Sequence, residues 1–296
     1  MGVSEAPRSV EGIEPTQSDD DDGGAQRVPR SRRRHRRRWL IGILCVVAVA
    51  AAVIAVLWSR TSAHPVSVDQ ARQRLHASTT VTQPRHLTLV PTPGVYAYKG
   101  SGTDALDKPP KSQAEGPTMP ATVTNQPGGC WQFRIDYSSN HWQTWNYCSH
   151  DGQLDEMGGT TYQKWDFVVF SNESTSTFDC DSSVTIRAAQ KPGDTWKQTC
   201  HDAANSSTIS AGPYRFVGTE TLKIGGRAVR ALHYHRDRTM SGGQIGTEHT
   251  DAWFDADNGL PLRNVRNIDV KTSTVIGDVH YTENASFDAT SLTPTT

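Results

Sequence analysis

The sequence predicts a mainly β protein with an N-terminal transmembrane helix and one extracytoplasmic domain, in which a curved antiparallel sheet forms a half-barrel-like meander with few short helices. Three observations lead to this fold class. An apolar run without charge occupies residues 39–58, the second half of the chain alternates apolar and polar residues between turn signals, and long helical periodicity is absent elsewhere. We therefore divide the 296 residues into a disordered cytoplasmic tail at 1–38, a transmembrane helix at 39–58, a juxtamembrane stalk with a short helix at 59–93 and a β domain at 94–296.

The tail at 1–38 is rich in charge and poor in apolar residues. Asp19 to Asp22 form an acidic run, and arginines gather between positions 27 and 38. Such a segment cannot bury enough apolar surface to offset the entropy of ordering, so we expect disorder. The arginines could bind nucleic acid or an acidic partner, or set the topology and attract anionic inner-leaflet lipids. We favour the second interpretation. We also expect no nucleic-acid partner for residues 59–296, where acids slightly outnumber bases.

The apolar run at 39–58 has the length of a membrane span. Its twenty residues, at about 1.5 Å each, cover roughly the 30 Å of a bilayer core. Trp39 and Trp58 stand at its ends as interfacial aromatics, and the arginines before it place the N-terminus inside and residues 59–296 outside. A signal peptide cleaved near Thr61-Ser62-Ala63 is the alternative, but the run exceeds the usual signal core. We expect an uncleaved, single-pass anchor in the cell membrane.

The region after the anchor contains one short helical signal and a few strand signals. Ser67 can cap a helix at Ser67–Ala77, where Ala71 and Leu75 share one side, and this helix either docks on the domain or forms a stalk. The composition of Gly100–Pro120 predicts a long loop. Besides the cysteine hairpin described next, strands are predicted at Val95–Lys99, Ala121–Thr124 and Phe167–Phe170.

Four cysteines lie outside the membrane: Cys130, Cys148, Cys180 and Cys200. An even number in an oxidising compartment favours two disulfides, for which three pairings exist. Residues 131–137 and 141–147 alternate around a short polar turn, and the register that pairs 137 with 141 places Cys130 opposite Cys148. We therefore predict the disulfides Cys130–Cys148 and, by elimination, Cys180–Cys200. We do not expect a zinc site, because no C-x-x-C pair occurs.

The C-terminal region reads as an antiparallel meander. Gly225-Gly226 is a two-residue hairpin turn, and further turn signals follow at 241–244 and 255–259. The strands predicted between these turns are Tyr214–Ile224, Arg227–Arg238, Ile245–Phe254, Leu260–Lys271 and Val275–Phe287.

Residues 253–263 read WFDADNGLPLR, which resembles the W-(L/F)-D-x-D-x-G-L-P-(L/V)-R hairpin of bacterial lipoprotein-carrier half-barrels of the LolA and LppX/LprG types. In that family a curved sheet wraps an apolar cavity that holds acyl chains. The resemblance covers mainly residues 214–285, and this chain departs from the family in having no lipobox and two expected disulfides. The whole layout also resembles a group of actinobacterial single-pass membrane proteins, which implies a topology and a fold but no activity. The matching segments are 94–98, 129–131, 195–196 together with Cys200, 259–263 and 291–294.

Three histidines are the candidate metal ligands. His233 and His235 share one face of a strand, and a hairpin register with residue numbers summing to 484 places His249 opposite His235. Such a cluster could bind Zn²⁺ or Cu²⁺ or act as a pH switch, but a register shifted by one residue turns His249 away. We favour partly exposed strand histidines and predict no metal or other cofactor. The acids at 255–259 are better explained by a turn than by a calcium loop.

The aromatic residues supply most of the apolar mass, and we interpret them mainly as core. If the sheet curls, a subset would line a ligand cavity: Trp131, Phe133, Trp145, Tyr147 and Trp253. No catalytic motif and hence no catalytic residue is identified. We therefore expect a non-enzymatic module of the cell envelope that binds a lipid or other apolar ligand. The alternatives are a protein-interaction or structural module of the envelope, and an envelope hydrolase.

Overall fold

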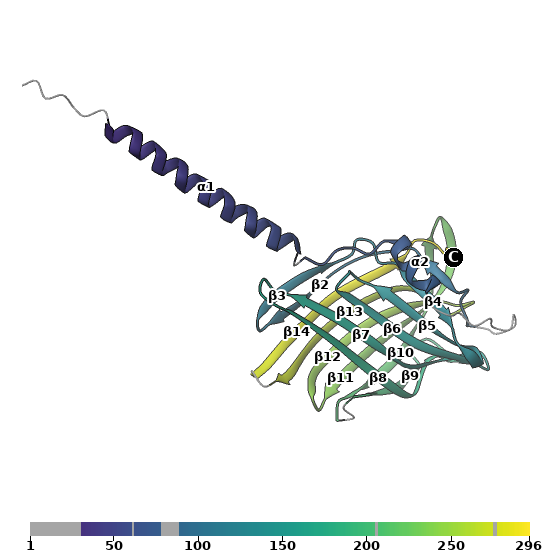
Figure 1. The fold of residues 1–296 in the computed structure, drawn as a ribbon. Coiled ribbons are helices and arrows are strands. Elements are labelled where there is room, and N and C mark those ends of the chain that lie inside the picture. Colours follow the sequence, from purple (N-terminus) through teal and green to yellow (C-terminus); the bar gives the residue numbers. More distant parts are fainter. Residues whose placement is uncertain (1–30, 61, 78–88, 205–206, 275–276) are drawn as a thin grey trace, which may run out of the picture. The chain divides into compact units, whose positions relative to one another are not determined.

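The computed structural model describes residues 31–60, 62–77, 89–204, 207–274 and 277–296. Within these residues, fourteen strands form a single curved antiparallel sheet, accompanied by two α-helices (Figure 1). The mainly β fold and the curved, half-barrel-like sheet predicted from the sequence are confirmed. The chain divides into two compact units, residues 1–55 and 56–296.

Helix α1 spans Ser31–Arg60, and its side chains are described at Ile41 and from residue 43 to residue 56. Among the residues that the structure describes, no helix combines the length and the apolar character needed to cross a membrane. The predicted span at 39–58 falls partly outside the described side chains. Of the predicted disordered tail, residues 1–30 lie outside the described residues, and residues 31–38 belong to α1.

Helix α2, Val68–His76, forms where the sequence predicts a short helix. Ser67 is its N-cap: the Ser67 hydroxyl accepts from the backbone N–H of Gln70, and the Gln70 side chain accepts from the backbone N–H of Ser67. Ala71 is fully buried, and Arg74 forms an ion pair with the buried Asp136 of the sheet. Of the two alternatives for this helix, docking on the domain is therefore the one observed.

The strands are named in chain order as in Figure 1. Their bounds are β1 Gly94–Tyr96, β2 Tyr98–Asp107, β3 Pro110–Glu115, β4 Ala121–Asn125, β5 Cys130–Asp136, β6 His141–His150, β7 Gln153–Asp166, β8 Ser171–Ile186, β9 Thr195–Asp202, β10 Ile209–Ile224, β11 Arg227–Ser241, β12 Gln244–Asp255, β13 Pro261–Thr274 and β14 Gly277–Ala289. From β4 to β14 each strand pairs with its neighbour in sequence, as expected for a meander.

The two ends of the sheet meet at the segment that contains β1 and β2. β1 pairs with β4, which continues to β5, whereas β2 pairs with β14 and β3. Since β1 and β2 follow each other directly along the chain, the sheet curves until its first and last strands are linked. One face of the sheet is thereby turned inward, and alternate residues of every strand point into an enclosed interior.

Two of the predicted hairpins form as expected. β5 and β6 pair as predicted, with Cys130 opposite Cys148 and Asp136 opposite Trp142. The turn between β10 and β11 has positive φ at both Gly225 and Gly226, the backbone that a two-residue hairpin of this type requires.

Two local predictions are wrong. Gly100–Pro120 is mostly a hairpin of β2 and β3 and not a long loop. Gly100 and Gly102 lie against the backbone of β14, where an added Cβ would collide with carbonyl oxygens, so these glycines serve close strand packing. Phe167–Phe170 is the turn between β7 and β8 and not a strand; the two phenylalanine rings stack across it at 4.6 Å.

The interior has three layers along the strands. The end of the sheet that carries the turn between β10 and β11 contains a core of aromatic and aliphatic side chains. Of these, Trp131, Phe133 and Leu154 are fully buried. A layer of buried charged side chains follows. At the opposite end, Met240, Ile268 and Val270 form a second apolar cluster. β11 shows the order in one strand: Tyr234 is in the core, Arg236 and Arg238 are in the charged layer and Met240 is in the second cluster.

Both predicted disulfides are confirmed. Cys130–Cys148 and Cys180–Cys200 each join neighbouring strands, with Cα atoms 3.9 Å apart. Each bond closes a short loop, with sequence separations of 18 and 20 residues. The remaining cysteine, Cys45 in α1, is free and exposed.

Replacing both Cys130 and Cys148 by serine should lower the free energy of unfolding by about 3 kcal/mol, because a loop of this length constrains the unfolded chain by about that much in the chain-entropy model. Urea unfolding of the full chain in detergent, followed by tryptophan fluorescence, measures the change. Cys45→Ser is the matched control and should leave the midpoint unaltered. Equal midpoints for the double variant and the wild type would contradict the prediction.

Candidate functional site

A cavity of about 780 Å³ opens at the end of the sheet that carries the second apolar cluster. Its lining includes residues at four turns of that end: Lys108 between β2 and β3, Phe170 between β7 and β8, Gln244 at the start of β12, and Thr274 at the end of β13. Lys108 and Phe170 are exposed, so the cavity reaches solvent here. Its volume is in the range typical of pockets for small organic ligands, roughly 300–1,000 Å³.

The wall of the cavity is partly apolar and partly hydroxylic. Met240, Ile268 and Val270 face it from β11 and β13, and Trp165 faces it from β7. Strand β8 contributes small polar side chains, among them Ser174 and Ser176. Small side chains on β8 leave space that the larger residues opposite do not fill.

The floor of the cavity is a ladder of alternating buried charges. It consists of Arg238, Glu156, Arg236, Glu248, Arg266 and Glu283, from strands β11, β7, β12, β13 and β14, and we call it the ionic floor. The shortest contact joins Arg236 Nη2 to Glu248 Oε1 at 2.6 Å. The side chains of all six residues are at most 8% exposed.

Contacts between the remaining neighbours complete the ladder. Arg236 Nη1 lies 3.2 Å from Glu156 Oε2, and Arg238 Nη2 lies 3.4 Å from Glu156 Oε1. On the other side, Arg266 Nε lies 3.5 Å from Glu248 Oε1, and Arg266 Nη1 lies 3.6 Å from Glu283 Oε1. The ladder therefore ends in a cation, Arg238, at one side and in an anion, Glu283, at the other.

The electrostatics of the ionic floor follow from this order. Burial by itself would raise the pKa of Glu248, but Arg236, Arg266 and Arg238 outweigh burial and hold that pKa far below its ordinary value. Burial would lower the pKa of Arg266, but Glu283 and Glu248 raise it. For Arg238, burial together with repulsion from Arg236 leaves the pKa of the guanidinium below its ordinary value. Arg238 is thus the cation whose charge is least compensated.

The floor also offers hydrogen-bond donors. The Nε groups of Arg236 and Arg238 are buried and have no hydrogen-bond partner among the described residues. A buried donor without a partner costs free energy, and an anion entering the cavity would satisfy it. The arrangement is therefore suited to receive a carboxylate or phosphate group beneath an apolar wall.

The five aromatic residues predicted to line a cavity are placed differently from one another. Trp145 borders the cavity. Phe133 and Tyr147 lie beside it in the core, where the remaining space is only about 20 Å³, enough for one water molecule. Trp131 packs on Tyr147 with ring centroids 4.7 Å apart. Trp253 lies on the outer face, where it stacks on His233 at 4.0 Å.

The three candidate histidines lie on the outer face of β11 and β12. In the observed register, His235 lies opposite Asp251 and His249 lies opposite Asp237. The strands are therefore shifted by two residues from the predicted register, whose paired residue numbers sum to 484. His249 is therefore not opposite His235. Carboxylates separate the imidazoles: Asp251 accepts from His233 at 2.9 Å and from His235 at 3.1 Å, and Asp237 lies 2.5 Å from His249. The three rings do not meet around one point.

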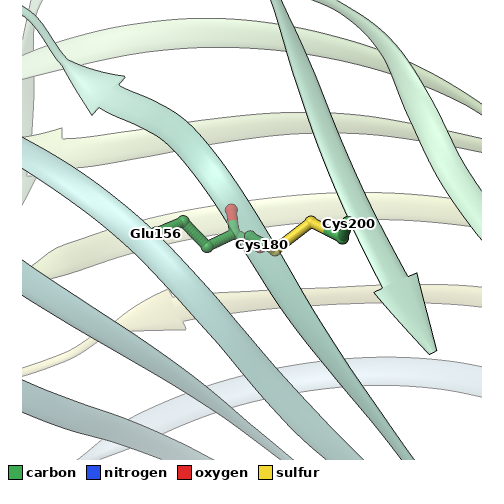
Figure 2. Close-up of side chains that lie close together, drawn as sticks. All are labelled: Glu156, Cys180 and Cys200. Atoms are coloured by element: carbon green, nitrogen blue, oxygen red, sulfur yellow. A yellow bond between two sulfur atoms is a disulfide. The ribbon is translucent and has the colours of Figure 1, made fainter. Parts of the chain in front are cut away.

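Figure 2 shows the second disulfide beside the ionic floor. Glu156 Oε1 lies 3.9 Å from Cys180 Sγ, and Glu156, Cys180 and Cys200 all line the cavity. This contact is not a hydrogen bond, because a disulfide sulfur carries no hydrogen. With both sulfurs in the disulfide, these residues offer no thiolate to a metal ion.

Sequence reasoning missed the ionic floor. One feature of the sequence could have indicated it. Successive residues of a strand point to opposite faces, so Arg236 and Arg238 of β11 lie on the same face as Tyr234 and Met240, which are buried. Their partner Glu156 lies 80 residues away along the chain, and no local pattern indicates this pairing.

Scans of the sequence against family models and against curated proteins find no match. Among solved structures, the hypothetical lipoprotein YmcC from Escherichia coli K12 is similar at 14% identity and a TM-score of 0.30, covering 76% of this chain and 98% of that one. A putative lipoprotein from Parabacteroides distasonis is similar at 12% identity and a TM-score of 0.32, covering 67% of this chain and 97% of that one. Likeness at this level identifies no family, and the resemblance of residues 253–263 to the carrier half-barrels stays a prediction.

Glu248→Gln should destabilise the fold by about 3–5 kcal/mol at neutral pH, because it leaves Arg236 and Arg266 buried without their shared carboxylate. The matched control is Asp251→Asn on the outer face of the same strand, which should cost less than about 1 kcal/mol. Denaturant unfolding of both variants measures the difference, and equal losses would show that the ladder is not held by Glu248.

The difference in stability between the wild type and Glu248→Gln should depend on pH. The pKa of Glu248 is lower in the folded state than its ordinary value of 4.5, so its stabilising contribution is fully present above that value and is lost as the pH falls through the folded value. The gap in stability between wild type and Glu248→Gln should therefore be constant near neutrality and shrink below pH 4.5.

Proposed function

We propose that this chain is a membrane-anchored extracytoplasmic module of the cell envelope that binds an amphiphile with an anionic headgroup, without a chemical step. The apolar wall would hold the hydrocarbon portion, and the cationic end of the ionic floor would receive the headgroup. The observation that carries the proposal is the combination of an open cavity of about 780 Å³ with guanidinium donors at its floor that have no hydrogen-bond partner in the described part of the chain. A purely apolar ligand would leave those donors unsatisfied.

The exposed apolar surface of α1 supports the anchor. Ile41, Leu44 and Val46 are 60%, 74% and 70% exposed, and further apolar side chains up to Val56 are also exposed. A helix that is apolar all round needs a surrounding apolar medium. Together with the charge-free run at 39–58 and the arginines that precede it, this favours a helix that crosses the membrane with the N-terminus inside.

His64 is fixed to a turn at the end of the sheet where the cavity opens. The backbone N–H of His64 donates to Ser139 Oγ at 2.9 Å, and the backbone N–H of Ser139 donates to the carbonyl of His64 at 2.7 Å. Ser139 is in the turn between β5 and β6, at the same end of the sheet as the cavity mouth.

The turn between β7 and β8 gives this end an apolar tip. Val168, Val169 and Phe170 are 60%, 88% and 52% exposed, and Phe167 and Phe170 also line the cavity. Exposed apolar groups at a cavity mouth are suited to contact a bilayer from which a lipid enters. We therefore propose that the ligand is taken from the membrane that holds the anchor.

Val270→Trp should abolish ligand retention by filling the cavity from β13. Native mass spectrometry of the full chain in detergent, after incubation with a lipid extract, should show a bound anionic lipid in the wild type and none in the variant. Val265→Trp is the matched control: Val265 lies on the outer face of the same strand and is 40% exposed, so binding should persist. If the wild type retains no lipid, the ligand-binding proposal fails.

Replacing both Val168 and Val169 by aspartate should slow lipid uptake from vesicles of phosphatidylglycerol and phosphatidylethanolamine at least tenfold, because charged groups disfavour contact with the apolar layer. Uptake is measured as the time course of lipid bound to protein. Val217→Asp, at another exposed apolar position on β10, should take up lipid at the wild-type rate. Unchanged uptake in the double variant would remove the turn from the entry route while leaving the binding proposal intact.

A further inference from the structure

A second cluster of buried ionisable groups lies beyond the anionic end of the ionic floor. It consists of Asp104 on β2, Glu115 on β3 and His141 on β6, and we call it the acidic triad. Asp104 and His141 are fully buried, and Glu115 is 5% exposed. One ligand-capable atom from each residue lies within 4.8 Å of the other two.

The geometry of the triad converges on His141 Nδ1. This nitrogen lies 2.5 Å from Glu115 Oε1 and 3.9 Å from Asp104 Oδ2. Asp104 Oδ1, Glu115 Oε2 and His141 Nε2 are buried and have no hydrogen-bond partner among the described residues. The triad therefore holds more acceptor capacity than the surrounding protein uses.

Neighbouring side chains hold the triad in place. The Gln113 side-chain amide donates to Asp104 Oδ2 at 3.0 Å, and Asn140 Nδ2 lies 3.5 Å from Gln113 Oε1. The imidazole of His141 stacks on Tyr137 with centroids 4.7 Å apart. Hydrogen bonds that orient a carboxylate and packing that fixes an imidazole plane are the outer-shell features of metal sites.

This region holds more carboxyl groups than cationic partners. Asp104, Glu115 and the adjacent Glu283 are three buried carboxyls, whereas His141 and Arg266 are the cationic partners described around them. Arg266 divides its charge between Glu283 at 3.6 Å and Glu248 at 3.5 Å. Buried carboxylates without compensation are costly, and a divalent cation would neutralise the excess.

We propose that Asp104, Glu115 and His141 form a binding site for a divalent transition-metal ion of the Zn²⁺ or Mn²⁺ class. One imidazole nitrogen and two carboxylate oxygens are a donor set that such ions accept. Glu283, which lines the cavity, is close enough to Glu115 and His141 to act electrostatically on both of them. The site is distinct from the outer histidines, where carboxylates separate the rings.

Zinc alone is the probe for this site. The full chain in detergent is stripped with a chelator, equilibrated with Zn²⁺ and analysed for bound metal by mass spectrometry of the elements. The wild type should retain one Zn²⁺ per chain, and Glu115→Gln and Asp104→Asn should each weaken binding at least tenfold. Asp251→Asn, which alters the outer histidine row, is the matched control and should bind zinc as the wild type does.

X-ray absorption at the zinc edge identifies the ligands of the metal in the wild type. This measurement tests the proposal even if a triad variant fails to fold. One imidazole together with oxygen donors and no sulfur is the expected ligand set. Two or more imidazoles, or loss of zinc in Asp251→Asn with retention in Glu115→Gln, would assign the metal to the outer face and overturn the proposal. Absence of stoichiometric zinc in the wild type would overturn it as well.

Discussion

The ionic floor is the constraint on which the remaining structure depends. Six buried charges alternate across five strands, and each forms its ion pairs with a neighbour from another strand. A slip of one residue in β11 would turn Arg236 and Arg238 outward, leaving Glu156 buried without its two arginines and Glu248 with Arg266 as its ion-pair partner. The ladder thus specifies the register of the sheet more strictly than the apolar core does, because apolar side chains can repack with less loss than buried charges.

The ionic floor also separates two different interiors. On one side, Phe133, Tyr147 and Phe254 fill the space almost completely, leaving about 20 Å³. On the other side, serines from β8 face Ile268 and Val270, and the space between them stays open. A charged layer cannot be covered on both sides by a tightly packed apolar core without leaving polar atoms unpaired. An open, partly hydroxylic cavity next to the floor is the arrangement that tolerates those charges.

The parts of the fold that were predictable from the sequence are those in which one strand face is apolar. The aromatic face of Trp131, Phe133 and Trp145 gave the register of β5 and β6 and with it the first disulfide. Strands β7 and β8 escaped prediction because their inward face is itself polar: Thr161, Gln163 and Ser176 line the cavity, so no alternation marks these strands. The ionic floor was not predicted for a related reason. Its arginines point inward, whereas buried positions are usually apolar, and the partners of these arginines lie far away in the sequence.

The order of charges in the ladder links the two proposed binding events. Because three arginines and three glutamates alternate, the ladder has unlike ends: Arg238 at one, Glu283 at the other. At one end, Arg238 contacts the neutral Gln198 and Glu156, and Glu156 also pairs with Arg236. The positive charge of Arg238 is therefore only partly compensated, which suits the proposed anionic headgroup. The end at Glu283 continues into Asp104 and Glu115, where His141 and Arg266 are the cationic partners and where we propose that a metal ion binds. An alternating row of buried charges with an even number of members ends in opposite charges, and the two proposed ligands, an anionic headgroup and a metal cation, match these ends in sign.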